Sequence, residues 1–372
     1  MLALVGCGRG GFDAVADGSG TGDAWWDANW LHRRKISFDN SLSTENLLSF
    51  PVLVALNGSF DYAKTQDQGQ DVRFVDADGL TQLAHEIESW NETASSSLWV
   101  GVPQIDAGSL VDHIWMYYDN VAASDAQNGG LWNSGYVGVW HLAADPLGVA
   151  PQMVDSTLYG NHGTAGGFTS NAARIAGQIG DALDYDGIDD FVDVGNGASL
   201  DNVFDNGGAF SAWIKPRSDG EANLGRILQK GEPTGAGWYC DVNRESVGAV
   251  HSACQFYQSG ANGGGVTLNP ALTLAVWTHY TVVFDTLNPN DFRLYLNGAS
   301  VPVNVSAASG TRADDRNYTL QLGNNGSSIR TFDGAIDEAR LSAVPRSDSW
   351  IAAEYRSMIG ALADIGAEET RP

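Results

Sequence analysis

The chain has 372 residues, of which 43% are hydrophobic, and a formal net charge of −25. This length and apolar content suit two domains, each with a core of its own. The negative charge would repel a polyanion, so nucleic acid is not expected as a partner. The sequence contains no run of about 18 apolar residues, so no membrane-spanning helix is expected.

The N-terminal residues Leu4-Val5-Gly6-Cys7 resemble the lipobox of bacterial lipoproteins. The resemblance implies a partial lipoprotein signal at residues 1–7, acylation of Cys7 and a flexible Gly/Asp/Ser-rich tether at residues 8–24. Only six residues precede Cys7 and none is Lys or Arg, so an accidental match is the alternative. We therefore expect an envelope protein that touches the membrane only through a lipid anchor at the outer surface; a secreted or periplasmic protein is the alternative.

Residues 25–122 form the first predicted domain. Turn pairs such as Asn57-Gly58 and Asp78-Gly79 separate short runs of alternating residues. We expect strands at residues 33–38, 50–56, 71–75, 84–90, 97–102 and 113–118. Short strands at this spacing predict an antiparallel β-sandwich.

Several segments of this unit follow the pattern of a known family. They are Trp30 with Arg33 and Arg34, Phe74 to Gly79, Glu86 to Asn91, Trp99 to Pro103 and Trp115 to Asn120. Together they resemble an uncharacterised prokaryotic surface domain that often precedes laminin G-like domains. The chain departs from that pattern at Asp119, where glycine is commoner. The family has no established activity, so the resemblance implies a context and not a mechanism.

The second domain is predicted at residues 136–365, after a polar, Gly-rich linker at residues 123–135. Short alternating strands fill it, and Asn297-Gly298 is typical of a type I′ hairpin turn. Ser347 is expected to cap a short helix, and residues 366–372 are expected to be a tail. The apolar stripe of that helix is Ile351, Tyr355, Met358, Ile359 and Leu362.

Three segments of the second domain carry a further resemblance: Phe210 to Pro216, Leu294 to Gly298 and Thr331 to Leu341. They resemble a laminin G-like, concanavalin A-like jelly roll. The resemblance implies an all-β protein of two β-sandwich domains, the second a jelly roll with a short C-terminal helix. It also implies a domain that binds a ligand at its surface and performs no chemistry.

Cys240 and Cys254 are fourteen residues apart on two predicted strands, where a disulfide would join a hairpin. Closing a loop of that length contributes about 3 kcal/mol in the chain-entropy model, and an oxidising compartment favours it. Two buried free thiols are the alternative.

The jelly-roll resemblance also implies a Ca²⁺ site that ties an early loop to the last strand. The implied ligands are Asp155, Gly160, Asn161 and Asp337. The alternative is an Asx-turn at Asp155 and a salt bridge from Asp337 or Glu338 to a nearby arginine. The acidic run Asp184 to Asp190 lacks the Gly and Glu positions of an EF-hand and predicts a hairpin turn that Asp190 helps to order.

Aromatic rings are the usual platforms for sugars, because ring faces stack on apolar sugar faces. Trp238, Tyr239 and Tyr257 on the middle strands are therefore the candidate ligand-binding residues, although alternate aromatics on a strand are expected in the core. The expected partner is a glycan or an extracellular protein.

A glycoside hydrolase needs two carboxylates across a cleft, and related jelly-roll hydrolases carry them on one face of a strand. Glu86-Ile87-Glu88 has that spacing but lies in the first domain, and no such pair stands on a predicted strand of the second. We therefore expect no catalysis. A concanavalin-type hydrolase or lyase, and a ligand-free spacer of the cell envelope, are the alternatives.

Overall fold

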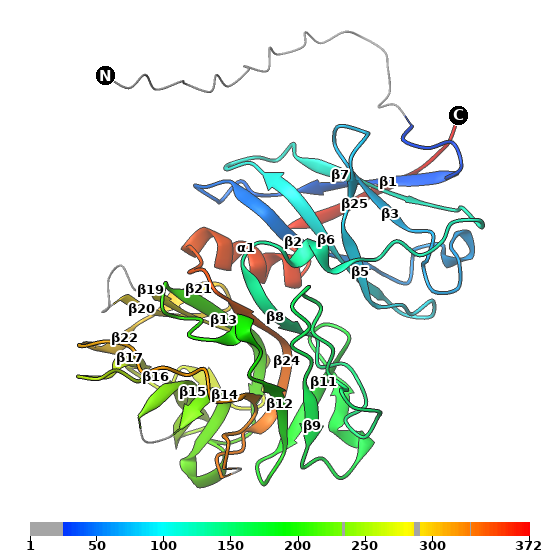
Figure 1. The fold of residues 1–372 in the computed structure, drawn as a ribbon. Helices are drawn as coiled ribbons and strands as arrows, with labels where there is room; N and C mark the ends of the chain where they lie inside the picture. Colours follow the sequence, from blue (N-terminus) through cyan, green and yellow to red (C-terminus); the bar gives the residue numbers. More distant parts are fainter. Residues whose placement is uncertain (1–24, 233–234, 286–290, 328) are drawn as a thin grey trace, which may run out of the picture.

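The computed structural model describes residues 25–232, 235–285, 291–327 and 329–372. The predicted signal at residues 1–7, with Cys7, and the predicted tether at residues 8–24 lie outside the described residues. The described part folds into two β-sandwiches with an α-helix at their junction (Figure 1), which confirms the expected all-β class. No helix in these residues is long and apolar enough to cross a membrane.

The first sandwich packs a five-stranded sheet, in the order β25-β1-β7-β3-β4, against a three-stranded sheet, β2-β6-β5. Its N-terminal strands are β1 (His32–Phe38), β2 (Leu47–Leu56), β3 (Arg73–Asp76), β4 (Gln82–Leu83), β5 (His85–Ser89), β6 (Ser96–Ile105) and β7 (His113–Tyr118). Alternate residues such as Ile36 and Phe38 of β1 and Val52 and Val54 of β2 turn inward to form the core.

The last strand of the first sandwich comes from the C-terminus of the chain. Strand β25 (Ala363–Thr370) pairs antiparallel with β1, with Phe38 opposite Ala363 and Arg33 opposite Glu369. The structure thus corrects the expected tail at residues 366–372 and the expected end of the second domain at residue 365. Acidic residues of this segment pair with cations of the first sandwich, as Glu369 with Arg33 at 2.8 Å.

Residues 123–135, expected to be a linker, are partly buried. The 3-10 helix η2 (Gly129–Trp132) places Leu131 and Trp132, each 2% exposed, in the core of the first sandwich. The two apolar side chains therefore anchor a segment whose polar and glycine residues suggested mobility. The other short 3-10 helices are η1 (Tyr62–Lys64), η3 (Asn171–Ala173), η4 (Ala198–Leu200) and η5 (Glu221–Asn223).

The second sandwich is a jelly roll of two large antiparallel sheets. The sheet nearer the first sandwich, here called the inner sheet, contains β8 (Tyr136–Trp140), β10 (Arg174–Ala176), β11 (Asp181–Asp186), β13 (Gly208–Pro216), β19 (Thr278–Asp285), β20 (Asp291–Leu296), β21 (Ala299–Val301) and β24 (Asp333–Ser342). The outer sheet contains β9 (Thr164–Gly166), β12 (Phe191–Gly195), β14 (Leu224–Glu232), β15 (Ala236–Ser246), β16 (Ala249–Phe256), β17 (Gly263–Thr267), β18 (Leu272–Thr273), β22 (Val303–Ser306) and β23 (Leu320–Leu322).

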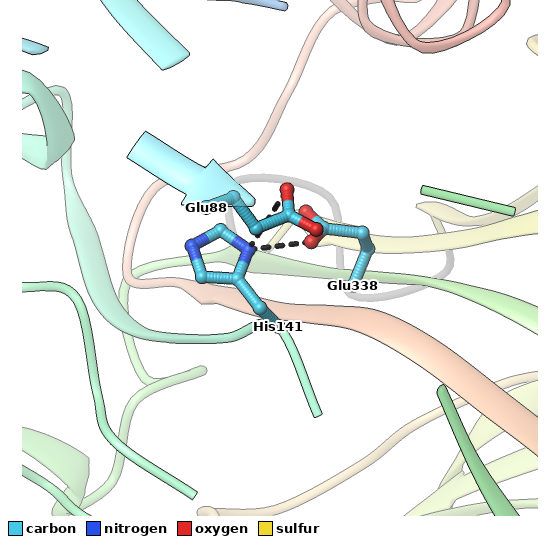
Figure 2. Close-up of side chains that lie close together, drawn as sticks. All are labelled: Glu88, His141 and Glu338. Carbon is cyan, nitrogen blue, oxygen red and sulfur yellow. Dashed lines mark hydrogen bonds and ion pairs between the residues drawn. The ribbon is translucent and has the colours of Figure 1, made fainter. Parts of the chain in front are cut away.

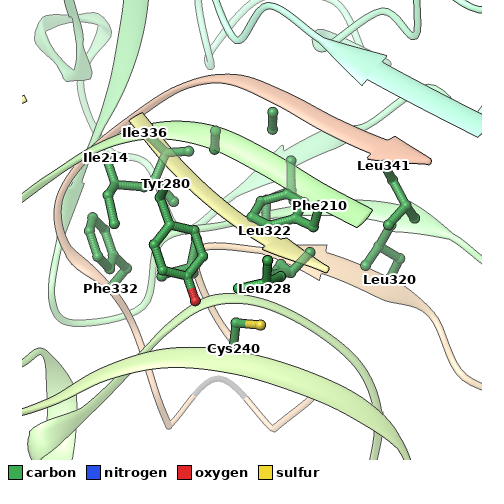
Figure 3. Close-up of a cluster of buried hydrophobic side chains, with 14 of the residues drawn as sticks. Phe210, Ile214, Leu228, Cys240, Tyr280, Leu320, Leu322, Phe332, Ile336 and Leu341 are labelled. Atoms are coloured by element: carbon green, nitrogen blue, oxygen red, sulfur yellow. The ribbon is translucent and has the colours of Figure 1, made fainter. Parts of the chain in front are cut away.

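The core of the jelly roll lies between these two sheets (Figure 3). Phe210 and Ile214 of β13 face Leu228 of β14 and Leu322 of β23, and all four are almost fully buried. A disulfide joins Cys240 on β15 to its cross-strand partner Cys254 on β16, which confirms the predicted pairing.

Local turn and cap signals are also confirmed. Asn297 and Gly298 both have positive φ, 52° and 76°, as a type I′ turn requires. Ser347 caps α1 (Asp348–Met358), because its hydroxyl accepts a hydrogen bond from the backbone N–H of Trp350 at 3.1 Å.

Helix α1 and the first sandwich cover the outward face of the inner sheet (Figure 1). Trp213 of β13 belongs to the same buried cluster as Trp350 of α1 and the core of the first sandwich, and the rings of Phe50 and Trp350 are 4.8 Å apart. The central strands of the inner sheet, β8, β13, β19 and β24, are therefore buried on both faces. The outer sheet lies on the side of the jelly roll away from the first sandwich.

Candidate functional site

Strand β15 carries two of the predicted ligand residues, and its alternation divides them between two faces. Trp238 points into the core with Cys240, is 2% exposed and donates from Nε1 to Asp315 Oδ2 at 3.2 Å. The prediction that Trp238 contacts a ligand is therefore wrong, because a period of two places it on the inward face. Tyr239 lies on the outward face beside Tyr257, with ring centroids 6.2 Å apart.

A row of polar side chains crosses the outward face of the outer sheet at right angles to the strands. We call it the polar stripe, and its members are paired directly across neighbouring strands: Asp193, Gln321, Gln229, Tyr239 and Gln255. Because neighbouring strands lie about 4.8 Å apart, the stripe is roughly 19 Å long. That length suits an extended ligand rather than a single small molecule.

A second row of polar groups supports the stripe. Arg226 forms an ion pair with Asp241 and donates from Nε to Gln229 Oε1 at 2.9 Å. The Arg226 guanidinium also lies 3.7 Å from the ring centroid of Tyr239, whose hydroxyl donates to Gln255 at 2.6 Å. Burial raises the pKa of Asp241 to about 6 although Arg226 opposes the shift, and burial raises the pKa of Tyr239 to about 12.

Two acceptor atoms on this face have no hydrogen-bond partner among the described residues. They are Oε1 of Gln321 and Oδ1 of Asn243, whose residues are 7% and 6% exposed. A buried polar atom left unpaired costs about 1–3 kcal/mol. Both atoms have almost no solvent-accessible surface, so a ligand would reach either one only after the side chains around it move.

Sequence reasoning found Tyr239 and Tyr257 but missed the polar residues around them. Gln229, Gln321 and Arg226 stand alone in the sequence, and each becomes part of the face only through strand register. One signal in the sequence could have found Tyr239. If Cys240 is buried, alternation along β15 places its neighbours Tyr239 and Asp241 on the outward face. The neighbouring strands offered no equivalent marker.

The residues expected to bind Ca²⁺ use most of their side-chain oxygen atoms in hydrogen bonds within the protein. Both carboxylate oxygens of Asp155 already accept hydrogen bonds, from the backbone of Val139 and from Thr157 and Asn161 at 2.8–3.0 Å. This is the Asx-turn alternative. The Asn161 side chain donates to the Val137 carbonyl, and Gly160 occupies a turn with φ of 68°.

Asp337 belongs to a separate hydrogen-bond network. Its Oδ2 accepts from the backbone N–H groups of Gln178 and Ile179 at 2.8 and 3.0 Å. The residues present at Asp155, Gly160, Asn161 and Asp337 therefore do not fit a calcium ion. Calcium binding by the chain stays a prediction.

The spaced pair Glu86 and Glu88 points toward the junction of the two sandwiches. Glu86 accepts hydrogen bonds from Trp132 Nε1 at 2.8 Å and from Ser156, and Glu88 accepts one from Trp99 Nε1 at 2.7 Å. Burial and the charge of Glu338 raise the pKa of Glu88 to about 8. The pair thus faces a protein interior and not the polar stripe.

Two family models match the chain. Residues 186–352 match the concanavalin A-like lectin/glucanases superfamily, and residues 68–131 match a domain of unknown function, DUF2341. The two resemblances seen in the sequence are thereby confirmed. A search of curated proteins finds no match.

Three solved binding domains illustrate the similarity in fold. The binding domain of Paraclostridial Mosquitocidal Protein 1 is 15% identical, with a TM-score of 0.44 over 60% of this chain and 52% of that one. Domain 4 of AbnA, an extracellular GH43 arabinanase from Geobacillus stearothermophilus solved with arabinotriose, is 19% identical, with a TM-score of 0.41 over 58% and 96%. The binding domain of botulinum neurotoxin DC in complex with SialylT is 12% identical, with a TM-score of 0.43 over 61% and 52%. The chain spans about half the length of the two toxin domains.

Proposed function

We propose that this protein is a non-catalytic recognition protein of the cell surface, and that it binds a glycan along the polar stripe of the outer sheet. The observation that carries the proposal is the stripe itself, in which Tyr239 lies between planar amide side chains on neighbouring strands. The lipobox-like segment supports a lipid anchor at Cys7 as part of the same proposal.

The architecture leaves the outer sheet as the face for a ligand. The outward face of the inner sheet is buried by α1 and the first sandwich, as Trp213 and Trp350 show. The first sandwich thus supports the jelly roll from one side, and the polar stripe lies on the opposite side. A rigid sheet also presents its side chains with little loss of entropy on binding.

The residue types on the stripe match the chemistry of a sugar. Glutamine and asparagine amides both donate and accept hydrogen bonds, as sugar hydroxyls do. Tyr257 and Tyr239 supply ring surface for the apolar face of a sugar ring.

A glycan array with the wild-type chain, followed by titration of the best ligand, tests the proposal. We expect a ligand whose affinity falls at least tenfold in Tyr239→Ala, because the substitution removes the aromatic ring surface of the stripe. Tyr159→Ala is the matched control, since Tyr159 is 60% exposed on a loop outside the outer sheet. Melting temperatures of all variants establish that they are folded.

A ligand that binds Tyr239→Ala as tightly as wild type would move the site off the stripe. A blank array would support the ligand-free spacer instead. Release of reducing ends from a bound glycan would support the hydrolase alternative, and in that case Glu88→Gln should abolish the release.

A further inference from the structure

A cluster of metal-ligating side chains joins the two sandwiches (Figure 2). Glu88 comes from β5 of the first sandwich, His141 follows β8, and Glu338 lies on β24 of the inner sheet. One ligand atom of each lies within 4.8 Å of the other two. The side chains are 1%, 11% and 0% exposed, respectively. We call these three residues the junction cluster.

Each carboxylate of the cluster has one oxygen held by a neighbour outside the cluster. Trp99 donates to Oε2 of Glu88 at 2.7 Å, and Arg340 binds Oε2 of Glu338 at 2.5 Å. The remaining oxygen of Glu338 meets only Nδ1 of His141, at 2.5 Å, and that of Glu88 has no partner among the described residues. Outer contacts of this kind orient the ligands of a metal ion.

The imidazole of His141 has the surroundings of a metal ligand. Its Nδ1 faces Glu338 and also lies 3.6 Å from Glu88 Oε2, while its Nε2 lies 3.6 Å from Glu86 Oε1. A histidine that binds a metal through one nitrogen usually directs the other toward a carboxylate. Glu86 is fixed for that role by its hydrogen bonds from Trp132 and Ser156.

Further features around the cluster favour a bound cation. Asp337, which is 0% exposed, also has a carboxylate oxygen, Oδ1, without a partner among the described residues. A Cβ on Gly180 would lie 2.8 Å from Oε1 of Glu88, so a larger residue there would displace the Glu88 carboxylate. A pocket of about 430 Å³ between the sandwiches, lined by Glu88, Gln178 and Gly180, offers an entry path and room for water.

Two residues at the junction cluster have a left-handed backbone conformation. Glu338 lies in β24 with φ of 53°, and Leu142, next to His141, has φ of 57°. Left-handed backbone at residues other than glycine costs about 1–3 kcal/mol and is found where a function requires it. The pairing register of β24 with β13 shifts between Asp337 and Arg340, the stretch that carries Glu338.

We propose that the junction cluster binds one divalent transition-metal ion of the Zn²⁺ class, with Glu88, His141 and Glu338 as its protein ligands. The ion would clamp the two sandwiches together. One imidazole and two carboxylates suit Zn²⁺ or a similar ion, whereas Ca²⁺ takes six to eight oxygen ligands. The proposal does not depend on glycan binding at the polar stripe.

Isothermal titration of the tag-free, chelator-treated chain with ZnCl₂ tests this proposal. We expect one equivalent to bind and the melting temperature to rise. Glu88→Gln should weaken binding at least tenfold and remove the rise, while keeping an acceptor for Trp99. Asp189→Asn is the control, since Asp189 belongs to the other acidic cluster, with the exposed Asp186 and the buried Asp190. The Zn²⁺ affinity of this variant should equal that of wild type.

Crystals soaked in ZnCl₂ give a second readout that does not rely on a variant. Anomalous scattering at the zinc edge should show one peak between Glu88, His141 and Glu338. No binding to wild type, wild-type affinity in Glu88→Gln, or a peak elsewhere in place of this one would overturn the assignment.

Discussion

The buried carboxylate of Asp190 orders a turn, and its burial makes the charged form less favourable. It follows the hairpin between β11 and β12, is 4% exposed, and accepts a hydrogen bond from the backbone N–H of Asp186 at 2.9 Å. Burial raises its pKa to about 6, and the charges of Asp186, Asp189 and Asp184 add to the shift against the effect of that hydrogen bond. Between about pH 4 and pH 6, the folded protein therefore holds a proton on Asp190 that the unfolded chain releases.

The sign of this shift gives a prediction for Asp190→Asn. A raised folded-state pKa stabilises the fold below the ordinary pKa of aspartate, and this contribution is lost as the pH rises through about 6. Asparagine keeps the acceptor for Asp186 without the charge. We expect the variant to match wild type near pH 4 and to be more stable by about 1–3 kcal/mol at pH 7.5, measured by urea unfolding in EDTA.

Asp189→Asn is the control, because it removes the same formal charge from an exposed position and should stay within about 0.5 kcal/mol of wild type at both pH values. A stability difference for Asp190→Asn that does not change with pH would contradict the pKa assigned to this carboxylate.

At the scale of elements, β25 converts β1 from an edge strand into an inner strand. Deletion of residues 363–372 would leave one side of β1 without hydrogen-bond partners and remove Ile365 from the core. We expect amide exchange of β1 to accelerate by more than tenfold while β13 and β19 stay protected. Hydrogen exchange with mass spectrometry measures both regions in one experiment.

The matched control for this deletion is Glu369→Gln, which removes only the ion pair with Arg33. Glu369 is 46% exposed in its side chain, and exposed pairs contribute about 0–1 kcal/mol. Unchanged protection of β1 after the deletion would show that the pairing with β25 contributes nothing to the first sandwich.

Local patterns predicted the elements whose signals are local. The strand expected at residues 113–118 is β7, the Asn297-Gly298 turn has the expected backbone, and Ser347 caps α1. Strand β25 was missed because its partner lies more than 300 residues away in the sequence. Pairings over that distance leave no trace in the composition of either strand.

The candidate sites also divide into features that local sequence patterns predict and features that depend on long-range contacts. Alternation correctly indicated that some aromatics on β15 and β16 would be core, but it did not say which, because a shift of one residue exchanges the faces. The Glu86-Glu88 spacing was visible in the sequence, whereas the approach of His141 and Glu338 depends on how the two sandwiches dock. Site residues drawn from three distant segments become recognisable only in the folded chain.

At the scale of the whole molecule, the two sandwiches share one buried cluster around α1. We therefore expect calorimetry to show a single cooperative transition for wild type. Trp350→Ala removes the contact with Phe50 and should cost about 3–5 kcal/mol, separating the transition into two. Ile359→Ala, at a position 44% exposed just after the same helix, should keep one transition. Two resolved transitions in wild type would contradict a shared core.

The position of β25 also sets an order for synthesis on the ribosome. Strand β1 leaves the exit tunnel early, but its second neighbour emerges only after every strand of the jelly roll. One edge of β1 therefore stays unpaired in the nascent chain while roughly the length of a second domain is translated. A chaperone that shields exposed strand edges would be needed most in that interval, and a ribosome that stalled before residue 363 would release a product with its first sandwich open.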